Sequence, residues 1–247
     1  MFRLRREPKV KAATADGARV YAVGDIHGRA DLLEALLRQI DDDCRDHAGQ
    51  VRLIFVGDYV DRGLQARAVI DRLIALERER YALTFLRGNH EAALLDFLSR
   101  PETGPYWFAI GGAETLYSYG LTAPATGASL DELKTASAAF KAALPDAHHE
   151  WLLRLELMAR SGDYLFVHAG VRPGRPLEQQ DERDLLEIRE PFLKHRGALP
   201  YVVVHGHTPA DRVVEDERRI GLDTGAYATG RLSAVRLEGA LRHVLST

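Results

Sequence analysis

The stretch "RLIFVGDYVDRG", residues 52–63, decides the fold. Its first part, Arg52 to Val56, is a short apolar run rich in β-branched and aromatic residues, which is typical of a buried strand. Its second part is polar and begins and ends with glycine, which lets the backbone turn sharply away from the strand. Because open α/β sheets bind ligands beyond the carboxyl ends of their strands, this stretch predicts such a sheet and a site at its edge.

The same arrangement recurs along the chain. Polar segments with glycine follow other predicted strands: "GDIHG" at 24–28, "GNHE" at 88–91, "HAG" at 168–170 and "HGHT" at 205–208. The further predicted strands are Arg19–Val23, Leu83–Leu86, Tyr164–Val167, Tyr201–Val204, Ile220–Leu222 and Leu232–Leu237. Helical periodicity lies between the early strands, at Ala30–His47, Ala66–Arg80 and Glu91–Leu98. This alternation predicts a parallel sheet sandwiched by helices in the first half, and the closely spaced last strands predict an antiparallel finish.

The middle of the chain, from Pro101 to about Arg160, has little strand signal. Helices are predicted at Leu130–Leu144 and His149–Met158, with a break at Pro145 between them. We therefore expect one domain over residues 1–247, with a helical insertion at about 101–160.

The composition excludes several classes of function. The formal net charge of −3 over 247 residues leaves no basic field for nucleic acid or an anionic membrane, so neither partner is expected. The single cysteine, Cys44, can form no internal disulfide and no cysteine-based zinc site. No apolar run follows the charged first residues, and we expect a cytoplasmic protein. Its oligomeric state is not readable from the sequence.

The polar segments supply oxygen and nitrogen donors without thiolate, a set that suits manganese, iron or zinc better than calcium. The candidate metal ligands are Asp25, His27, Asp58, Asn89, His168 and His207. Asp58 has two carboxylate oxygens and is our candidate to bridge two divalent cations, which would activate a shared water and so favour hydrolysis.

Three neighbouring residues suit the binding of a phosphate ester and the protonation of its leaving group. His90 has a near-neutral intrinsic pKa that suits protonation of a leaving group, and Asp61 can orient it. Arg62 offers a planar fork of donors that matches phosphate oxygens, although a salt bridge to a nearby carboxylate is an alternative for it.

These motifs resemble those of the calcineurin-like metallophosphoesterases, and more narrowly the phosphoprotein phosphatase group, whose signature runs GDxHG, GDxxDRG, GNHE. Later segments, such as "GGAETLYSYG" at 111–120 and "GLDTGA" at 221–226, look like the compact bacterial and phage-type members. The likeness covers nearly the whole chain from about Arg19. It implies an α/β fold, a β-sandwich of mixed sheets flanked by helices in four layers (α/β/β/α).

The resemblance also implies the roles of the site residues. One metal would be bound by Asp25, His27 and Asp58, and the second by Asp58, Asn89, His168 and His207. Mn²⁺ is the expected ion at both positions, with iron or zinc as alternatives. His90 matches the general acid and Asp61 its partner, while Arg62 and Arg189 match arginines that bind phosphate. Arg87 also fits the family pattern, and we expect it to form a supporting salt bridge.

The pair of histidines in "VVVHGHTP", residues 202–209, divides between two roles. Alignment with the other segments makes His207 the ligand and His205 a supporting residue at the strand end. Many members of the wider superfamily have a further histidine where this chain has Pro209, but the phosphoprotein phosphatase group also lacks it.

The function expected from this resemblance is a phosphomonoesterase that hydrolyses phosphoserine and phosphothreonine by attack of a metal-bridging hydroxide, with phosphotyrosine or small phosphoesters as further substrates. One alternative is a symmetrical dinucleoside tetraphosphatase, but those enzymes tend to carry GDIQG where this chain has "GDIHG". Another is a non-catalytic regulatory module of the same fold. Such a module should lack a ligand, and here none is missing.

Overall fold

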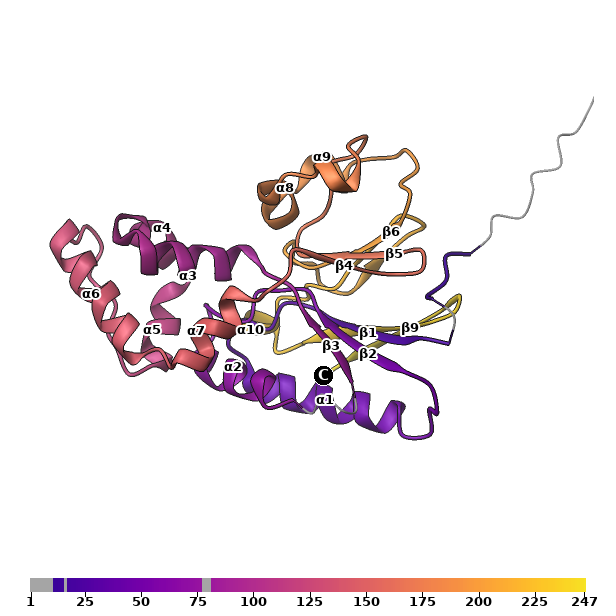
Figure 1. Ribbon diagram of the computed structural model, residues 1–247, viewed down its shortest axis with the longest axis horizontal. Helices are drawn as coiled ribbons and strands as arrows, with labels where there is room; N and C mark the ends of the chain where they lie inside the picture. The colour runs from indigo at the N-terminus through magenta and orange to yellow at the C-terminus, as the bar shows by residue number, and fades with distance from the viewer. Residues whose placement is uncertain (1–10, 16, 77–80) are drawn as a thin grey trace, which may run out of the picture.

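The computed structural model describes residues 11–15, 17–76 and 81–247 (Figure 1). A first five-stranded sheet of these residues has the order β10-β9-β1-β2-β3. Its strands are β1 (Arg19–Val23), β2 (Val51–Phe55), β3 (Ala82–Phe85), β9 (Ser233–Glu238) and β10 (Leu241–Ser246). β1, β2 and β3 are parallel, whereas β9 runs antiparallel to β1 and β10 antiparallel to β9. The predicted parallel first half is confirmed. The antiparallel finish is confirmed for β9 and β10, whereas the two predicted strands before them, at 201–204 and 220–222, pair parallel to each other in the second sheet.

A second five-stranded sheet has the order β4-β5-β6-β8-β7. Its strands are β4 (Met158–Ser161), β5 (Tyr164–Val167), β6 (Val202–His205), β7 (Val214–Glu215) and β8 (Arg219–Gly221). β5, β6 and β8 are parallel, and the short strands β4 and β7 close the two edges in the antiparallel sense. Both sheets are therefore mixed, as the four-layer prediction requires.

The two sheets pack face to face, and the side-chain alternation of β1 shows why. Val20 and Ala22 lie in the apolar core between the sheets, together with Phe166 of β5. Tyr21 points the other way, into a second core that contains Leu33 of α1. Successive strand residues thus bury opposite faces of the sheet. The predicted α/β/β/α fold is confirmed, but the simpler expectation of helices on both faces of the parallel sheet is wrong, because the second sheet covers one face.

Helices form the two outer layers. The outer face of the first sheet is covered by α1 (Ala30–Asp43) and α2 (Ala66–Ile74), and α3 (Asn89–Ser99) packs into the same apolar cluster. The outer face of the second sheet is covered by α8 (Glu182–Glu187) and α9 (Glu190–Leu193), which follow the short helix η2 (Leu177–Gln179). Figure 1 shows these two outer layers on opposite sides of the paired sheets.

A group of helices lies between β3 and β4 at one end of the sandwich (Figure 1). It comprises η1 (Pro101–Thr103), α4 (Gly104–Ala109), α5 (Gly112–Ser118), α6 (Leu130–Ala143) and α7 (Asp146–Leu153). α6 begins where the Ser129 hydroxyl accepts from the N–H of Glu132 and the Glu132 carboxylate accepts from the N–H of Ser129, a capping box. The division into one domain with an insertion stays a prediction.

Three predicted helix ends differ from the structure. The helix predicted to reach His47 ends at Asp43. The helix predicted to reach Met158 ends at Leu153, and β4, which we did not predict, begins at Met158. The helix predicted to reach Arg80 ends at Ile74, and the last part of that prediction, 77–80, lies outside the described residues. Within the described ranges, the helices are too short or too polar to cross a bilayer.

Candidate active site

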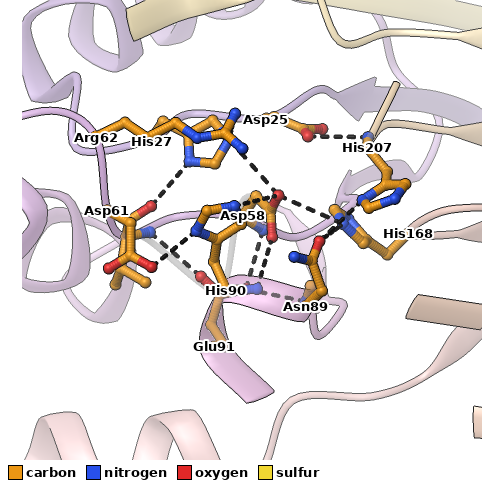
Figure 2. A network of polar contacts seen from close by, with 12 residues as sticks. Asp25, His27, Asp58, Asp61, Arg62, Asn89, His90, Glu91, His168 and His207 are labelled. Carbon is orange, nitrogen blue, oxygen red and sulfur yellow. Dashed lines mark hydrogen bonds and ion pairs between the residues drawn. The ribbon is translucent and has the colours of Figure 1, made fainter. Parts of the chain in front are cut away.

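The predicted site residues follow the carboxyl ends of strands from both sheets and lie close together (Figure 2). The first sheet contributes them after β1, β2 and β3, and the second sheet after β5 and β6. In chain order, the residues that meet here are Asp25, His27, Asp58, Asp61, Arg62, Asn89, His90, His168 and His207. Because parallel strands present their carboxyl ends at one edge, segments nearly 200 residues apart in sequence share one site.

Asp58 lies at the centre of this cluster and is almost completely buried. Its Oδ2 atom is 3.5 Å from Nε2 of His27, 3.4 Å from Nε2 of His168 and 3.8 Å from Nε2 of His90. Burial raises the pKa of Asp58, but the neighbouring histidines, His168 first among them, outweigh burial and hold the pKa below its ordinary value. Asp58 is therefore an ionised carboxylate at neutral pH.

Backbone carbonyls fix the ring nitrogens of two of these histidines. Nδ1 of His27 donates to the carbonyl of Val60 and Nδ1 of His168 to the carbonyl of Val56, each at 2.9 Å. Burial lowers the pKa of His27 to about 3 and also lowers that of His168, so both rings are neutral. Their Nε2 atoms then carry lone pairs that face Asp58. In metal sites, a hydrogen bond from the other ring nitrogen commonly orients a histidine ligand in this way.

Several hydrogen-bond acceptor atoms of the cluster face one another without a donor between them. His168 Nε2 faces not only Asp58 but also Oδ1 of Asn89, at 3.0 Å. Nδ1 of His207 can donate to the same Oδ1, at 2.9 Å, which leaves Nε2 of His207 as the acceptor of that ring. Two buried atoms have no hydrogen-bond partner, Oδ1 of Asp25 and Nε2 of His207. Unpaired buried acceptors cost free energy unless a donor or cation satisfies them. The residues present therefore fit a site for divalent cations.

Two groups of described residues have ligand atoms within 4.8 Å of one another. Asp58, His168 and His207 form one group, which agrees with the predicted second metal site. The other group is His27, Asp58 and His90, whereas the predicted first site has Asp25 in place of His90. Asp25 accepts from the N–H of His207 through Oδ2, at 2.9 Å, and its pKa is well above the ordinary value because of burial and the negative charges of Asp223 and Asp58. A cation would relieve this crowding of carboxylates.

His90 pairs with Asp61, as predicted. Its Nδ1 lies 2.7 Å from Oδ2 of Asp61. Burial lowers the pKa of His90, but the charge of Asp58 and the hydrogen bond with Asp61 outweigh it and raise the pKa above its ordinary value. A raised pKa favours the protonated imidazole, which is the form that a general acid requires.

Asp61 is itself held by residues that the sequence did not point to. Nε1 of Trp107 donates to both of its oxygens, at 3.1 and 2.9 Å, and the Thr115 hydroxyl donates to Oδ1 at 2.7 Å. Thr115 Oγ1 also accepts from the N–H of Asp61, at 2.8 Å. The segment "GGAETLYSYG" that contains Thr115 was noticed only as a family likeness, and Trp107 lies in a stretch that showed no readable pattern.

The two predicted phosphate-binding arginines contact different residues of the cluster. Nη1 of Arg62 donates to Nε2 of His27, at 3.1 Å, so this guanidinium already faces the predicted metal ligands. Nη2 of Arg189 donates to the carbonyl of His207, at 3.3 Å. Arg87, in the predicted supporting role, forms an ion pair of 3.3 Å with Glu182.

The backbone of the site is strained. Every non-glycine residue of the described chain with a positive φ is a predicted site residue: His27 at 45°, Asp58 at 55°, Asp61 at 69°, Arg62 at 66° and His207 at 63°. Left-handed conformations cost L-residues about 1–2 kcal/mol each, and they persist where the surroundings enforce them. Such outliers concentrate at functional sites, so the backbone marks the same residues independently of their side chains.

Glu91 braces the turn after β2, and no role for it was predicted although it belongs to "GNHE". Its two oxygens accept four backbone N–H bonds, from Gly88 at 2.9 Å, Asp58 at 3.0 Å, Tyr59 at 2.8 Å and Val60 at 3.2 Å. This buried side chain thereby ties the start of α3 to the turn that carries Asp58.

The two histidines at the end of β6 have different surroundings, in line with their separate predicted roles. His207 lies in the cluster, while His205 is buried beside it and turned away. Nδ1 of His205 donates to the carbonyl of Gly206 at 2.9 Å, and its Nε2 accepts from Nη1 of Arg219 at 3.3 Å. Gly206 between them has room for no side chain, because a Cβ would lie 1.8 Å from Oδ1 of Asp25.

Comparison with known families and proteins identifies the family of this chain. The family model described as calcineurin-like phosphoesterase matches residues 18–241. The serine/threonine-protein phosphatase 1 of Salmonella typhimurium is 30% identical over 224 residues, which are 89% of this chain and 92% of that protein. The family match therefore spans every predicted site residue and all strands of both sheets except β10, of which it includes only the first residue.

Other similar proteins are named for a different activity, the hydrolysis of dinucleoside tetraphosphates. The symmetrical bis(5'-nucleosyl)-tetraphosphatase of a Janthinobacterium species is 31% identical over 154 residues, which cover 62% of this chain and 44% of that protein. A solved structure of a protein proposed to be a diadenosine tetraphosphatase superposes with a TM-score of 0.64 at 24% identity, over 96% of this chain and 98% of the other. That structural likeness concerns the fold.

Proposed function

Since the chain belongs to the calcineurin-like phosphoesterase family, we propose that it is a metal-dependent phosphomonoesterase that hydrolyses phosphoserine and phosphothreonine in proteins, with phosphotyrosine and small phosphoesters as further substrates. The observation that carries this proposal is the His90–Asp61 pair beside the buried Asp58 cluster, because it offers a proton donor next to a site for cations. The match over nearly the full length of a relative named a serine/threonine-protein phosphatase supports the substrate class.

We propose that two divalent cations, Mn²⁺ or alternatively iron or zinc, occupy the cluster. Asp58 would contribute to both sites, and the other ligands would be Asp25 and His27 for the first ion and Asn89, His168 and His207 for the second. When bound, such a pair supplies a water of near-neutral pKa as nucleophile and neutralises charge on the phosphoryl oxygens.

The chain's own residues then position the substrate and transfer the proton. The guanidinium groups of Arg62 and Arg189 would bind the non-bridging oxygens of the phosphoryl group. His90 would donate its Nε2 proton to the oxygen that leaves phosphorus. Asp61 would hold the imidazole through Nδ1, and Trp107 and Thr115 would hold Asp61.

The test is phosphate release from a phosphoserine peptide by the purified protein in the presence of Mn²⁺. We expect turnover that a chelator abolishes, and none from Asp58→Asn. Asp96→Asn is the matched control, because it makes the same change at an exposed carboxylate of α3 and should leave turnover unchanged. Full activity of Asp58→Asn would refute the dinuclear site.

The second candidate, a dinucleoside tetraphosphatase, is favoured by the names of two similar proteins. His27 argues against the symmetrical type, whose members tend to carry glutamine there. Comparing the hydrolysis of the phosphoserine peptide with that of diadenosine tetraphosphate under the same conditions decides between them. A strong preference for the dinucleotide would replace our proposal.

A further inference from the structure

Tyr227 is an exposed aromatic residue that contacts two residues of the site. It lies in α10 (Ala226–Thr229), the short helix between β8 and β9. The guanidinium carbon of Arg62 lies 4.9 Å from the centroid of its ring, and the His27 ring meets it edge-on at 5.5 Å. The residue is nevertheless 41% exposed. A partly exposed aromatic residue therefore lies next to the proposed phosphate-binding arginine.

The backbone that carries Tyr227 is firmly held. Nη1 of Arg29 donates to the carbonyl of the preceding residue, Ala226, at 2.9 Å. The N–H of Gly225 donates to Oδ1 of Asp223, also at 2.9 Å. A ring fixed on such a support loses little conformational freedom when another group stacks on it.

We propose that Tyr227 is a specificity-determining residue that stacks on an aromatic leaving group, so that phosphotyrosine in a peptide, one of the further substrates proposed above, gains binding that phosphoserine does not. This inference rests on the proposed phosphomonoesterase activity. An aromatic leaving group bonded to a phosphoryl group on Arg62 has the exposed ring of Tyr227 beside it. A serine or threonine side chain has no ring and gains nothing from that surface.

The size of the effect follows from ring stacking. Aromatic pairs contribute about 0.5–1.5 kcal/mol beyond their buried area, which corresponds to about 2- to 12-fold in kcat/KM or in affinity. The contribution is confined to aromatic substrates. Any effect of Tyr227 on the position of Arg62 acts on aromatic and aliphatic substrates alike.

The first experiment compares two peptides of one sequence that carry phosphotyrosine or phosphoserine, with Mn²⁺ present. In Tyr227→Leu, the ratio of kcat/KM for the two peptides should fall about 2- to 12-fold towards the phosphoserine peptide. Tyr227→Phe keeps the ring and should keep the ratio. Tyr117→Leu removes a more exposed tyrosine, on α5, and should also leave the ratio unchanged. An equal loss on both peptides in Tyr227→Leu would overturn the inference.

The second experiment measures binding and does not need turnover. Calorimetry should find that phenylphosphonate binds the wild-type protein more tightly than ethylphosphonate, and that Tyr227→Leu loses this difference. If the wild type hydrolyses neither peptide but shows the preference, the proposed function fails, while the stacking of Tyr227 on aromatic groups stands. If it hydrolyses both peptides and shows no preference in either experiment, the inference fails and the proposed function stands.

Discussion

Thr115→Val tests whether the helical segment controls the proposed general acid. Thr115 is completely buried, and its hydroxyl donates to Oδ1 of Asp61 and accepts from the N–H of the same residue. Valine has nearly the same shape, so the substitution removes both hydrogen bonds without opening a cavity. Asp61 would keep Trp107 and His90 as partners.

The magnitude follows from the two lost bonds. A hydrogen bond to a charged group contributes about 1.5–3 kcal/mol, and a buried N–H without a partner costs about 1–3 kcal/mol. Together they predict a loss of about 2.5–6 kcal/mol in the free energy of unfolding. Burial already raises the pKa of Asp61, and the bond from Thr115 counteracts this. Its loss raises that pKa further and weakens the support for a protonated His90.

Urea denaturation and steady-state kinetics check this prediction. We expect a lower denaturation midpoint, and a fall in kcat that stays below the roughly 10²- to 10⁴-fold cost of losing a general acid. Thr135→Val is the matched control, because Thr135 is exposed and bonds only within α6. It should change stability by no more than about 0.5 kcal/mol. If Thr115→Val denatures like this control and retains full kcat, the reasoning is wrong.

Three further predictions concern other parts of the chain. His207→Ala should lose Mn²⁺ affinity and activity together, whereas His205→Ala should lose clearly less in calorimetry and turnover; equal losses would contradict their separate roles. His90→Ala should lower kcat by about 10²- to 10⁴-fold and keep its metal content, and loss of metal would make His90 a ligand. The two hydrogen bonds from Arg172 lower the pKa of Asp184 in the folded protein. The pair therefore stabilises the fold at pH values above about 3.9, the pKa of an unfolded aspartate, and this stabilisation is lost as the pH falls through the lower pKa of the folded state. Thermal melts of Arg172→Ala and wild type should therefore differ at pH 6 and converge near pH 2.5, while a constant difference would count against the pair.

The sequence predicted the parts of the fold that repeat a local pattern. Buried strands such as β2 and β5 are continuous apolar runs, so their positions followed from composition alone. β4 and β10 were missed for a physical reason. β4 reads Met-Ala-Arg-Ser, and β10 is largely exposed at the edge of its sheet, so neither shows the apolar run of a buried strand.

The proposed ligands were predictable because each stands beside a glycine at the end of a strand, in a motif of fixed spacing. Thr115 and Trp107 were not, because their contacts with Asp61 span 54 and 46 residues and leave no local periodicity. Tyr227 is likewise connected to Arg62 only through the meeting of distant segments. Sequence patterns report what a residue's neighbours along the chain require, whereas these roles arise from neighbours in space.

The turn at residues 58–62 shows how the strained site is sustained. It contains three of the left-handed residues, at a cost of about 1–2 kcal/mol each, yet each of its backbone N–H groups has an acceptor. Glu91 accepts the first three, Thr115 the fourth, and the carbonyl of Gly111 accepts the last. Five such bonds at about 0.5–1.5 kcal/mol each are of the size needed to offset the strain. The last two of the five bonds end on Thr115 and Gly111, in the segment that contains α4 and α5. Changes in that segment therefore reach Asp58 through the backbone of this turn.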